Sequence, residues 1–181
     1  MGRVVIVSQR HDQLVPLIMK KVPDAVAVTN FKTELQAGDV LCWLPTLDEF
    51  VDDKVQELVE LIDHSVFLPA KIIMLSVAGT ANDASEDQIR QWYGKRGQQL
   101  ILAHQYSVKM IDELELPYTI IRTIPLTTAV TSSQIVAEGK VMHGQQVGLT
   151  QLAELIEQLV VTDDYRNQSI GLASGESEES Q

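Results

Sequence analysis

The chain has 181 residues, enough for one domain with a buried core. Its 14 basic and 25 acidic side chains give a formal net charge of −11, which argues against non-specific nucleic-acid binding because such binding needs clustered lysine and arginine. The single Cys42 excludes an internal disulfide, and no apolar run reaches the roughly 18 residues of a membrane span. The first apolar run is also too short for a secretory signal, so we expect a cytoplasmic protein.

The first third of the chain alternates short apolar runs with polar links. Val4–Val7 is apolar at every position, which is typical of a strand covered on both faces. After the polar link Ser8–Asp12, apolar residues at helical spacing predict a helix with Pro16 in its first turn. Residues 25–29 and 40–44 are the next strand candidates. The link between them is too short for a helical crossover, so we expect an irregular bridge across the sheet.

The middle of the chain predicts a βαβ unit. The capping-box pattern Thr46-Leu-Asp-Glu49 predicts the start of a helix that precedes it. Residues 71–76 then form a buried strand that ends in a serine. A short helix is predicted over 86–93 and a long one over 98–114, and a second buried strand follows at 118–124.

The last part of the chain predicts one more helix and strand. Thr150 is the expected N-cap of a helix over 151–161, and residues 168–172 are the last strand candidate. Residues 173–181 are polar and acidic, so a disordered tail is expected there. The predicted organisation is therefore a single domain over residues 1–172, followed by the tail.

The order of these elements predicts an α/β fold. It is a Rossmann-like three-layer sandwich, with a mostly parallel sheet, helices on both faces and one βα crossover shortened. Ligands bind such sheets outside the carboxyl ends of the strands, so Ser76 and Thr123–Thr127 mark the expected site. Four strands are expected to lie next to one another in a common direction: 4–7, 40–44, 71–76 and 118–124.

Two strings in the second half of the chain carry a family resemblance. Lys71-Ile-Ile-Met-Leu-Ser-Val-Ala-Gly79 is followed by Glu115-Leu-Pro-Tyr-Thr-Ile-Ile-Arg-Thr-Ile-Pro-Leu126, and Val147–Ala153 and Tyr165–Leu172 fit a last helix and strand. On these residues the chain resembles the NmrA-like, NAD(P)H-binding branch of the atypical short-chain dehydrogenase/reductases. The N-terminal third is similar to that family only in layout.

The resemblance implies an NAD(P) dinucleotide laid across the carboxyl edge of the sheet. It implies that Ser76 lies near the nicotinamide and is the candidate catalytic residue. It also implies a set of cofactor-binding residues at the ends of the strands: Ser8, Gln9, Arg10, Leu44, Pro45, Ser76, Val77, Ile124, Pro125 and Leu126.

The first turn departs from the family pattern. The family has a glycine-rich loop there, which lets the backbone approach a pyrophosphate at a helix N-terminus. The turn Ser8-Gln-Arg-His-Asp12 contains no glycine. We expect Asp12 to repel a phosphate and Arg10 to compensate only in part, so dinucleotide binding should be weakened or absent.

The catalytic Tyr-x-x-x-Lys pair of the family is also missing. The long helix offers Tyr106 and Lys109, which are spaced three apart and displaced from the expected position, where Ile101 and Gln105 stand. We therefore expect Tyr106 and Lys109 on an exposed helix face.

Other polar and aromatic residues have structural interpretations. His104 falls on the inward stripe of the long helix, where a packed or partner-facing histidine is expected. Trp92 and Tyr93 are expected in a loop beside a cleft, where aromatic residues can cap a ligand or contact a partner, and packing on their own domain is the first expectation. Arg122 lies in a buried strand and needs a partner, for which an ion pair is the first expectation. The four histidines are scattered, so no metal site is expected.

Two functions remain open from the sequence. The first is an NAD(P)H-dependent reductase of a small carbonyl or quinone, with weakened dinucleotide contacts. The second is a catalytically inactive Rossmann module that senses a ligand or binds a protein, with a homodimer formed through the 98–114 helix and its neighbour as one form of it. Neither predicts a nucleic-acid or membrane partner.

Overall fold

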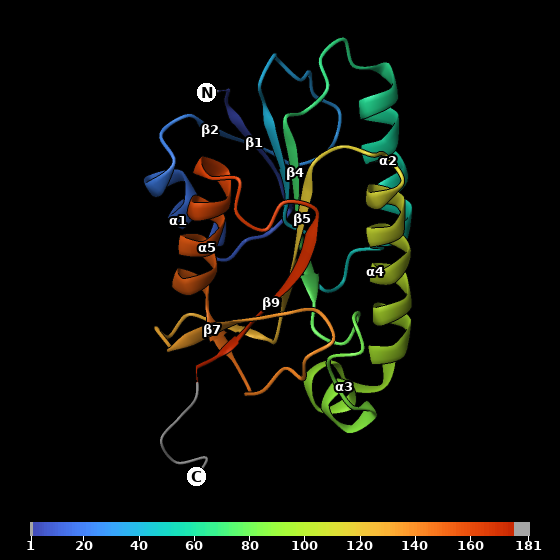
Figure 1. Ribbon diagram of the computed structural model, residues 1–181, viewed down its shortest axis with the longest axis vertical. Coiled ribbons are helices and arrows are strands. Elements are labelled where there is room, and N and C mark those ends of the chain that lie inside the picture. The colour runs from blue at the N-terminus through green and yellow to red at the C-terminus, as the bar shows by residue number, and fades with distance from the viewer. Residues whose placement is uncertain (1, 176–181) are drawn as a thin grey trace.

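The computed structural model describes residues 2–175 and has seven strands in one sheet, in the order β2-β1-β3-β4-β5-β9-β7 (Figure 1). Each neighbouring pair is parallel except β7 and β9, which are antiparallel. The strands are β1 (Val4–Val7), β2 (Ala25–Val28), β3 (Val40–Trp43), β4 (Lys71–Val77), β5 (Tyr118–Thr123), β7 (Ser133–Val136) and β9 (Gln168–Ser174). The four expected strands do lie side by side in a common direction.

Helices cover both faces of the sheet, which confirms the three-layer prediction. Figure 1 shows α1 (Leu14–Lys21) and α5 (Leu149–Val161) on one face, and α2 (Val51–His64) and α4 (Gly97–Asp112) on the other. The short α3 (Glu86–Tyr93) lies near the carboxyl edge and continues into a 3-10 turn, η1 (Gly94–Arg96). Within residues 2–175, no helix has both the length and the apolar character that crossing a membrane requires.

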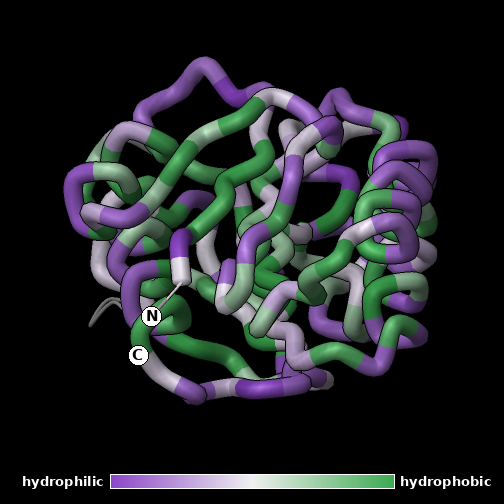
Figure 2. The backbone as a smooth tube through the Cα atoms, turned by 90° about the horizontal axis from the view of Figure 1, so that it is seen from above, coloured by the Kyte–Doolittle hydropathy of each residue, from purple (hydrophilic) through white to green (hydrophobic). Residues whose placement is uncertain are grey.

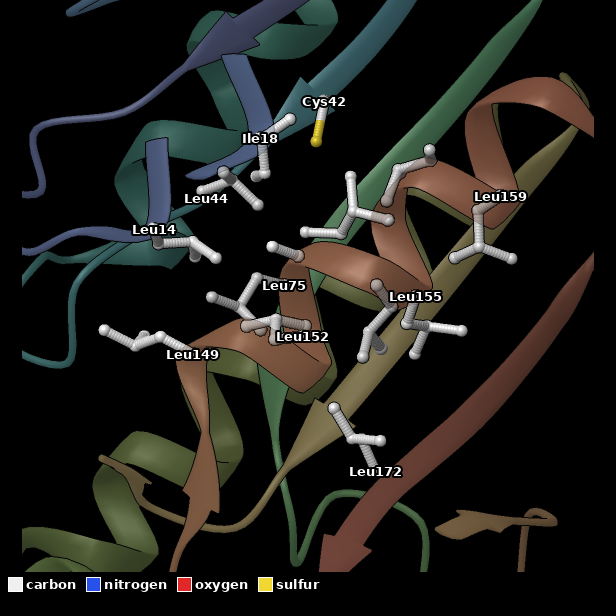
Figure 3. Packing of buried hydrophobic residues seen from close by; sticks show 14 of the residues in the cluster. Leu14, Ile18, Cys42, Leu44, Leu75, Leu149, Leu152, Leu155, Leu159 and Leu172 are labelled. Carbon is white, nitrogen blue, oxygen red and sulfur yellow. The ribbon is translucent and has the colours of Figure 1, made fainter. Parts of the chain in front are cut away.

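Apolar side chains fill the space between the layers. All seven residues of β4 are buried, as expected for a central strand covered on both faces. Figure 2 shows hydrophobic segments gathered inside and hydrophilic ones on the outer turns of the helices. In Figure 3, leucines of α5 and residues of α1 pack together between these helices and the sheet. Its labelled members are Leu14, Ile18, Cys42, Leu44, Leu75, Leu149, Leu152, Leu155, Leu159 and Leu172.

An irregular bridge replaces the helix between β2 and β3, as predicted. Its Phe31 and Leu35 are buried with residues of β1 and α2, so the bridge runs across the face that α2 covers. The Phe31 ring meets the Trp43 ring edge-on, with 5.5 Å between centroids. At the far end, the buried Asp39 carboxylate accepts hydrogen bonds from Arg3 at 2.7 and 3.2 Å. Phe31 and Leu35 therefore cover the sheet where a helix would otherwise lie, and the Arg3–Asp39 ion pair holds the end of the bridge.

The strand order changes direction at β1: the chain first adds β2 on one side of it and then adds β3 on the other side. β1 pairs with β2 on one side and with β3 on the other, and the later parallel strands continue outward from β3. In open α/β sheets such a switch point is where ligands bind, at the carboxyl ends of the strands. The fold therefore directs attention to the turns that follow β1 and β3.

The prediction that α2 starts at Thr46 is wrong, because the helix begins at Val51. The backbone N–H of Thr46 does donate to the Glu49 carboxylate, at 2.5 Å, but this closes a separate turn. Leu47 and Phe50, which continue the apolar spacing backward, are consequently exposed, with 74% of the Phe50 surface accessible.

The C-terminal boundaries also differ from prediction. Helix α5 begins at Leu149 with Gly148 as N-cap, so Thr150 lies inside the first turn. β9 continues through Ser174, two residues into the predicted tail, because β7 pairs with it there. The remaining tail residues, 176–181, lie outside the described residues. Short strands that the sequence did not predict are β6 (Leu126–Thr127), β7 and β8 (Val147–Gly148), of which β6 and β8 pair with each other.

Candidate functional site

A pocket of about 280 Å³ opens at the carboxyl ends of β4 and β5. Apolar side chains such as Leu47, Leu75 and Leu149 form much of its wall. It brings together seven of the ten residues predicted to bind a cofactor, which are Arg10, Pro45, Ser76, Val77, Ile124, Pro125 and Leu126. The polar residues of its lining come from separate elements and are Arg10, Asp12, Thr46, Ser76, Tyr93, His104, Thr123, Thr127 and Thr128.

The other three predicted residues lie outside this pocket. The Ser8 hydroxyl donates to the backbone carbonyl of Leu44 at 2.9 Å, and Leu44 itself is fully buried in the core. Gln9 lines a second, more open cleft of about 870 Å³. The two cavities share Thr46. Acidic side chains outnumber basic ones in the second cleft. Its charged and histidine residues are Asp48, Glu49, Asp53, Glu57, Lys54 and His11.

Ser76 and His104 form a buried polar pair in the wall of the pocket. Ser76 stands near the end of β4, and its Oγ lies 3.0 Å from Nδ1 of His104 on α4. His104 is only 2% exposed, and burial lowers its pKa to about 4, so the imidazole is neutral at pH 7. Its Nε2 has no hydrogen-bond partner within residues 2–175. The inward stripe placed His104 correctly, but the contact with Ser76 had no signal in the sequence.

Tyr93, one of the two aromatics that the sequence places beside a cleft, lines the pocket, although it is not among the predicted cofactor-binding residues. It is the last residue of α3, rather than part of a loop, and its hydroxyl donates to the backbone carbonyl of Thr123 at 3.3 Å. Burial and then the nearby Asp83 charge raise the pKa of the phenol, so it stays protonated. The neighbouring Trp92 donates from Nε1 to the Gly144 carbonyl at 3.2 Å, which confirms that it packs on its own domain.

Tyr106 and Lys109 lie on the exposed side of α4, as predicted. The Tyr106 side chain is 42% exposed, and its hydroxyl accepts a hydrogen bond from Gln56 of α2 at 2.5 Å. Neither residue lines the pocket. The homodimer expected through this helix stays a prediction.

The turn after β1 holds an ion pair at the switch point. The Arg10 guanidinium contacts the Asp12 carboxylate at 2.5–3.2 Å and donates to the Pro45 carbonyl at 2.9 Å, so it connects the ends of β1 and β3. The Asp12 carboxylate also accepts from the backbone N–H of Leu14, the first residue of α1. Burial alone would raise the pKa of Asp12, but the hydrogen bonds and charge of Arg10 lower it. An ionised carboxylate therefore occupies the N-terminus of α1.

A buried ion pair confirms the expected partner of Arg122. Both Arg122 and Asp83 are fully buried, and their side chains form a direct salt bridge. Arg122 also donates to the Ser169 hydroxyl at 2.9 Å, and Asp83 accepts from the backbone N–H of Gly79 at 2.7 Å. Gly79 has φ +107, and a Cβ there would lie 2.7 Å from Ile101 Cδ1. The network therefore fixes the loop that follows β4, next to Ser76.

No protein-family model and no curated protein matches the sequence. Solved structures do match the fold. A short-chain dehydrogenase/reductase from Veillonella parvula DSM 2008 aligns with a TM-score of 0.74 and 13% identity, over 96% of this chain and 95% of that one. A structure of such a protein from the same organism in complex with NADP aligns at 0.67, with 14% identity over 96% and 95%. The chain therefore has a Rossmann-like α/β fold of the kind that these structures share.

A Rossmann-fold NAD(P)-binding family protein from Shigella flexneri aligns with this chain at a TM-score of 0.68. Its identity is 11%, over 98% of each chain. At identities this low, the likeness establishes the fold alone. The NmrA-like branch and the cytoplasmic location stay predictions.

Rossmann-like folds hold dinucleotides at the carboxyl ends of their strands, so the residues there show how well this chain suits one. The two ends of a dinucleotide have room, one in the pocket and one in the second cleft, which meet at Thr46. The volume of the pocket is near the lower end of the range for ligand sites. The pyrophosphate in the middle of the dinucleotide is repelled, because Asp12 places a negative charge at the helix N-terminus where Rossmann folds hold this group. The chain therefore fits the nicotinamide and adenosine ends better than the phosphates that join them.

Proposed function

We propose that the protein binds a nicotinamide dinucleotide weakly along the carboxyl edge of the sheet and reduces a small carbonyl or quinone in the pocket beside Ser76. The observation that carries the proposal is the Ser76–His104 pair, which stands in a largely apolar pocket at the ends of β4 and β5. The likeness to an NADP complex of the same fold supports the choice of cofactor.

The residues of the pocket divide the work of such a reaction. A bound nicotinamide dinucleotide would supply the hydride. Ser76 hydrogen-bonds the carbonyl oxygen and orients it, while the apolar wall excludes water. Reduction also needs a proton, and the Ser76 and Tyr93 hydroxyls are groups that hold one in the pocket. Tyr93 would have to release its hydrogen bond to the Thr123 carbonyl before donating.

The ion pair at the switch point sets the expected affinity. A dinucleotide can place its pyrophosphate at α1 only if the Asp12 carboxylate leaves, and this breaks the contact with Arg10. The freed Arg10 would then face the phosphates. Replacing one charge pair by another in this way gives little net gain, so binding should be weak in the natural protein.

Calorimetric titration of the full chain with NADPH and NADH tests the proposal. We expect micromolar to submillimolar binding, and no binding of either dinucleotide at millimolar concentration would refute it. Arg10→Ala should weaken the affinity, whereas Asp12→Asn should strengthen it several-fold by removing a like charge. Asp24→Asn is the matched control, because it removes the same charge just beyond the other end of α1. An unchanged affinity in Arg10→Ala would remove Arg10 from the site.

The same ion pair favours a second candidate, a ligand-binding module that takes no dinucleotide. An internal carboxylate that permanently fills the phosphate position would leave the pocket beside Ser76 free for a small uncharged ligand. Two results together would favour this candidate over the reductase. The protein would bind a small carbonyl compound, and neither the natural protein nor Asp12→Asn would bind NADPH or NADH.

A further inference from the structure

The ring of His104 has one satisfied and one unsatisfied nitrogen. Nδ1 lies 3.0 Å from Ser76 Oγ, while Nε2 is buried and has no partner among the described residues. A neutral imidazole carries its single proton on one nitrogen and a lone pair on the other. Two arrangements are therefore open, and they give Ser76 opposite roles.

The energetic cost separates the two arrangements. If the proton sat on Nε2, a donor would be buried without an acceptor, which is rare in folded proteins. If it sits on Nδ1, Nε2 keeps only a lone pair without a donor, which proteins tolerate more readily, and the hydrogen left to find an acceptor is that of the Ser76 hydroxyl, which lines the pocket. The second arrangement is therefore favoured, and in it Nδ1–H donates to Ser76 Oγ.

We propose that His104 is a positioning residue, which donates from Nδ1 to Ser76 Oγ and thereby frees the Ser76 hydroxyl hydrogen for a ligand in the pocket. Ser76 then has no other side-chain hydrogen bond within residues 2–175. The free hydroxyl hydrogen needs an acceptor, so we expect an acceptor atom of the ligand, such as a carbonyl oxygen, beside it. This inference rests on the proposed function only for the claim that the oxygen belongs to a carbonyl.

The other groups around the pair reinforce this polarity. The Tyr93 hydroxyl hydrogen is engaged by the Thr123 carbonyl, and the Arg10 charge is matched by Asp12. Among the charged lining residues there is thus no free anion to hold a cationic ligand group. We expect the pocket to accept a neutral carbonyl compound and to reject an ammonium of the same size.

Nitrogen-15 NMR of protein labelled in its histidines tests the tautomer directly. His104→Asn assigns the His104 signals among those of the four histidines. We expect a protonated Nδ1 and a bare Nε2 at pH 7. A proton on Nε2 would overturn the inference, whatever the protein does with a dinucleotide.

Ligand titration then tests the consequence, with acetophenone and benzylammonium as probes and no dinucleotide present. We expect acetophenone to shift the His104 signals and benzylammonium to leave them unchanged. Ser76→Ala should weaken acetophenone binding about fivefold to tenfold, which corresponds to one neutral hydrogen bond. Preference for benzylammonium, or an unchanged affinity in Ser76→Ala, would contradict the assigned donor.

A rescue variant separates positioning from simple packing. His104→Phe fills the space without a donor and should weaken acetophenone binding as much as Ser76→Ala does. His104→Asn places an amide N–H near the position of Nδ1 and should restore most of the affinity. Equal losses in the two variants would mean that His104 only packs. Because these titrations omit the dinucleotide, their failure is distinct from a failure of the proposed function. The tautomer itself is read on the natural protein, and His104→Asn serves there only to assign the signals.

Discussion

Replacing Asp83 by asparagine should destabilise the protein by about 3–5 kcal/mol, the cost of leaving a buried charge without its partner. Arg122 and Asp83 are both fully buried, and the remaining acceptors of Arg122 are neutral groups, including the Ser169 hydroxyl and carbonyl. Asparagine keeps the size of the side chain and can still accept from the Gly79 N–H, so the loss isolates the charge. Against a total stability of about 5–15 kcal/mol, this is a large fraction.

Urea denaturation followed by tryptophan fluorescence measures this loss, because Trp43 is buried in the core. For a chain of this length, the same change lowers the unfolding midpoint temperature by about 6–20 °C. Arg122→Met should also destabilise, and the double variant Asp83→Asn/Arg122→Met should lose clearly less than the two single losses combined. A loss below about 1 kcal/mol in Asp83→Asn, or additive losses in the double variant, would refute the reasoning.

Three further predictions concern single buried groups. Because the folded pKa of His104 is about 4 and the unfolded value is 6.5, the unfolded chain binds the extra proton first. Stability should therefore fall by about 3 kcal/mol as the pH drops from 6.5 to 4, and denaturation of His104→Phe should lack this slope. Lys71 donates from Nζ to the carbonyls of Leu159 and Thr162 at the end of α5, so Lys71→Met should cost about 2 kcal/mol in the same assay. Burial raises the pKa of Cys42 to about 12, so a thiol reagent should label it only at the rate of unfolding; rapid labelling of the native protein would contradict this.

The sheet was predictable because its signal is local. Runs such as Val4–Val7 and the strand from Lys71 are apolar at successive positions, and this is the pattern of a strand buried on both faces. Arg122 was also informative, since a charge within an apolar strand demands a partner. The identity of that partner was not readable, because Asp83 lies 39 residues away and reaches Arg122 only through the tertiary fold.

The candidate site was less predictable for the same reason. The contact between Ser76 and His104 joins residues 28 apart, and nothing in their spacing indicates it. Asp12 was expected to repel a phosphate and Arg10 to compensate, but their mutual pairing depends on the conformation of the turn. The start of α2 was placed too early because apolar spacing cannot tell a helix from the turn that precedes it.

The two border strands of the sheet have a consequence for the behaviour of the protein at high concentration. Exposed backbone groups on a border strand can template pairing with another molecule, which leads to aggregation. Here the border strands β2 and β7 are each only four residues long. Another molecule can therefore pair with only a few free backbone groups at either edge of the sheet.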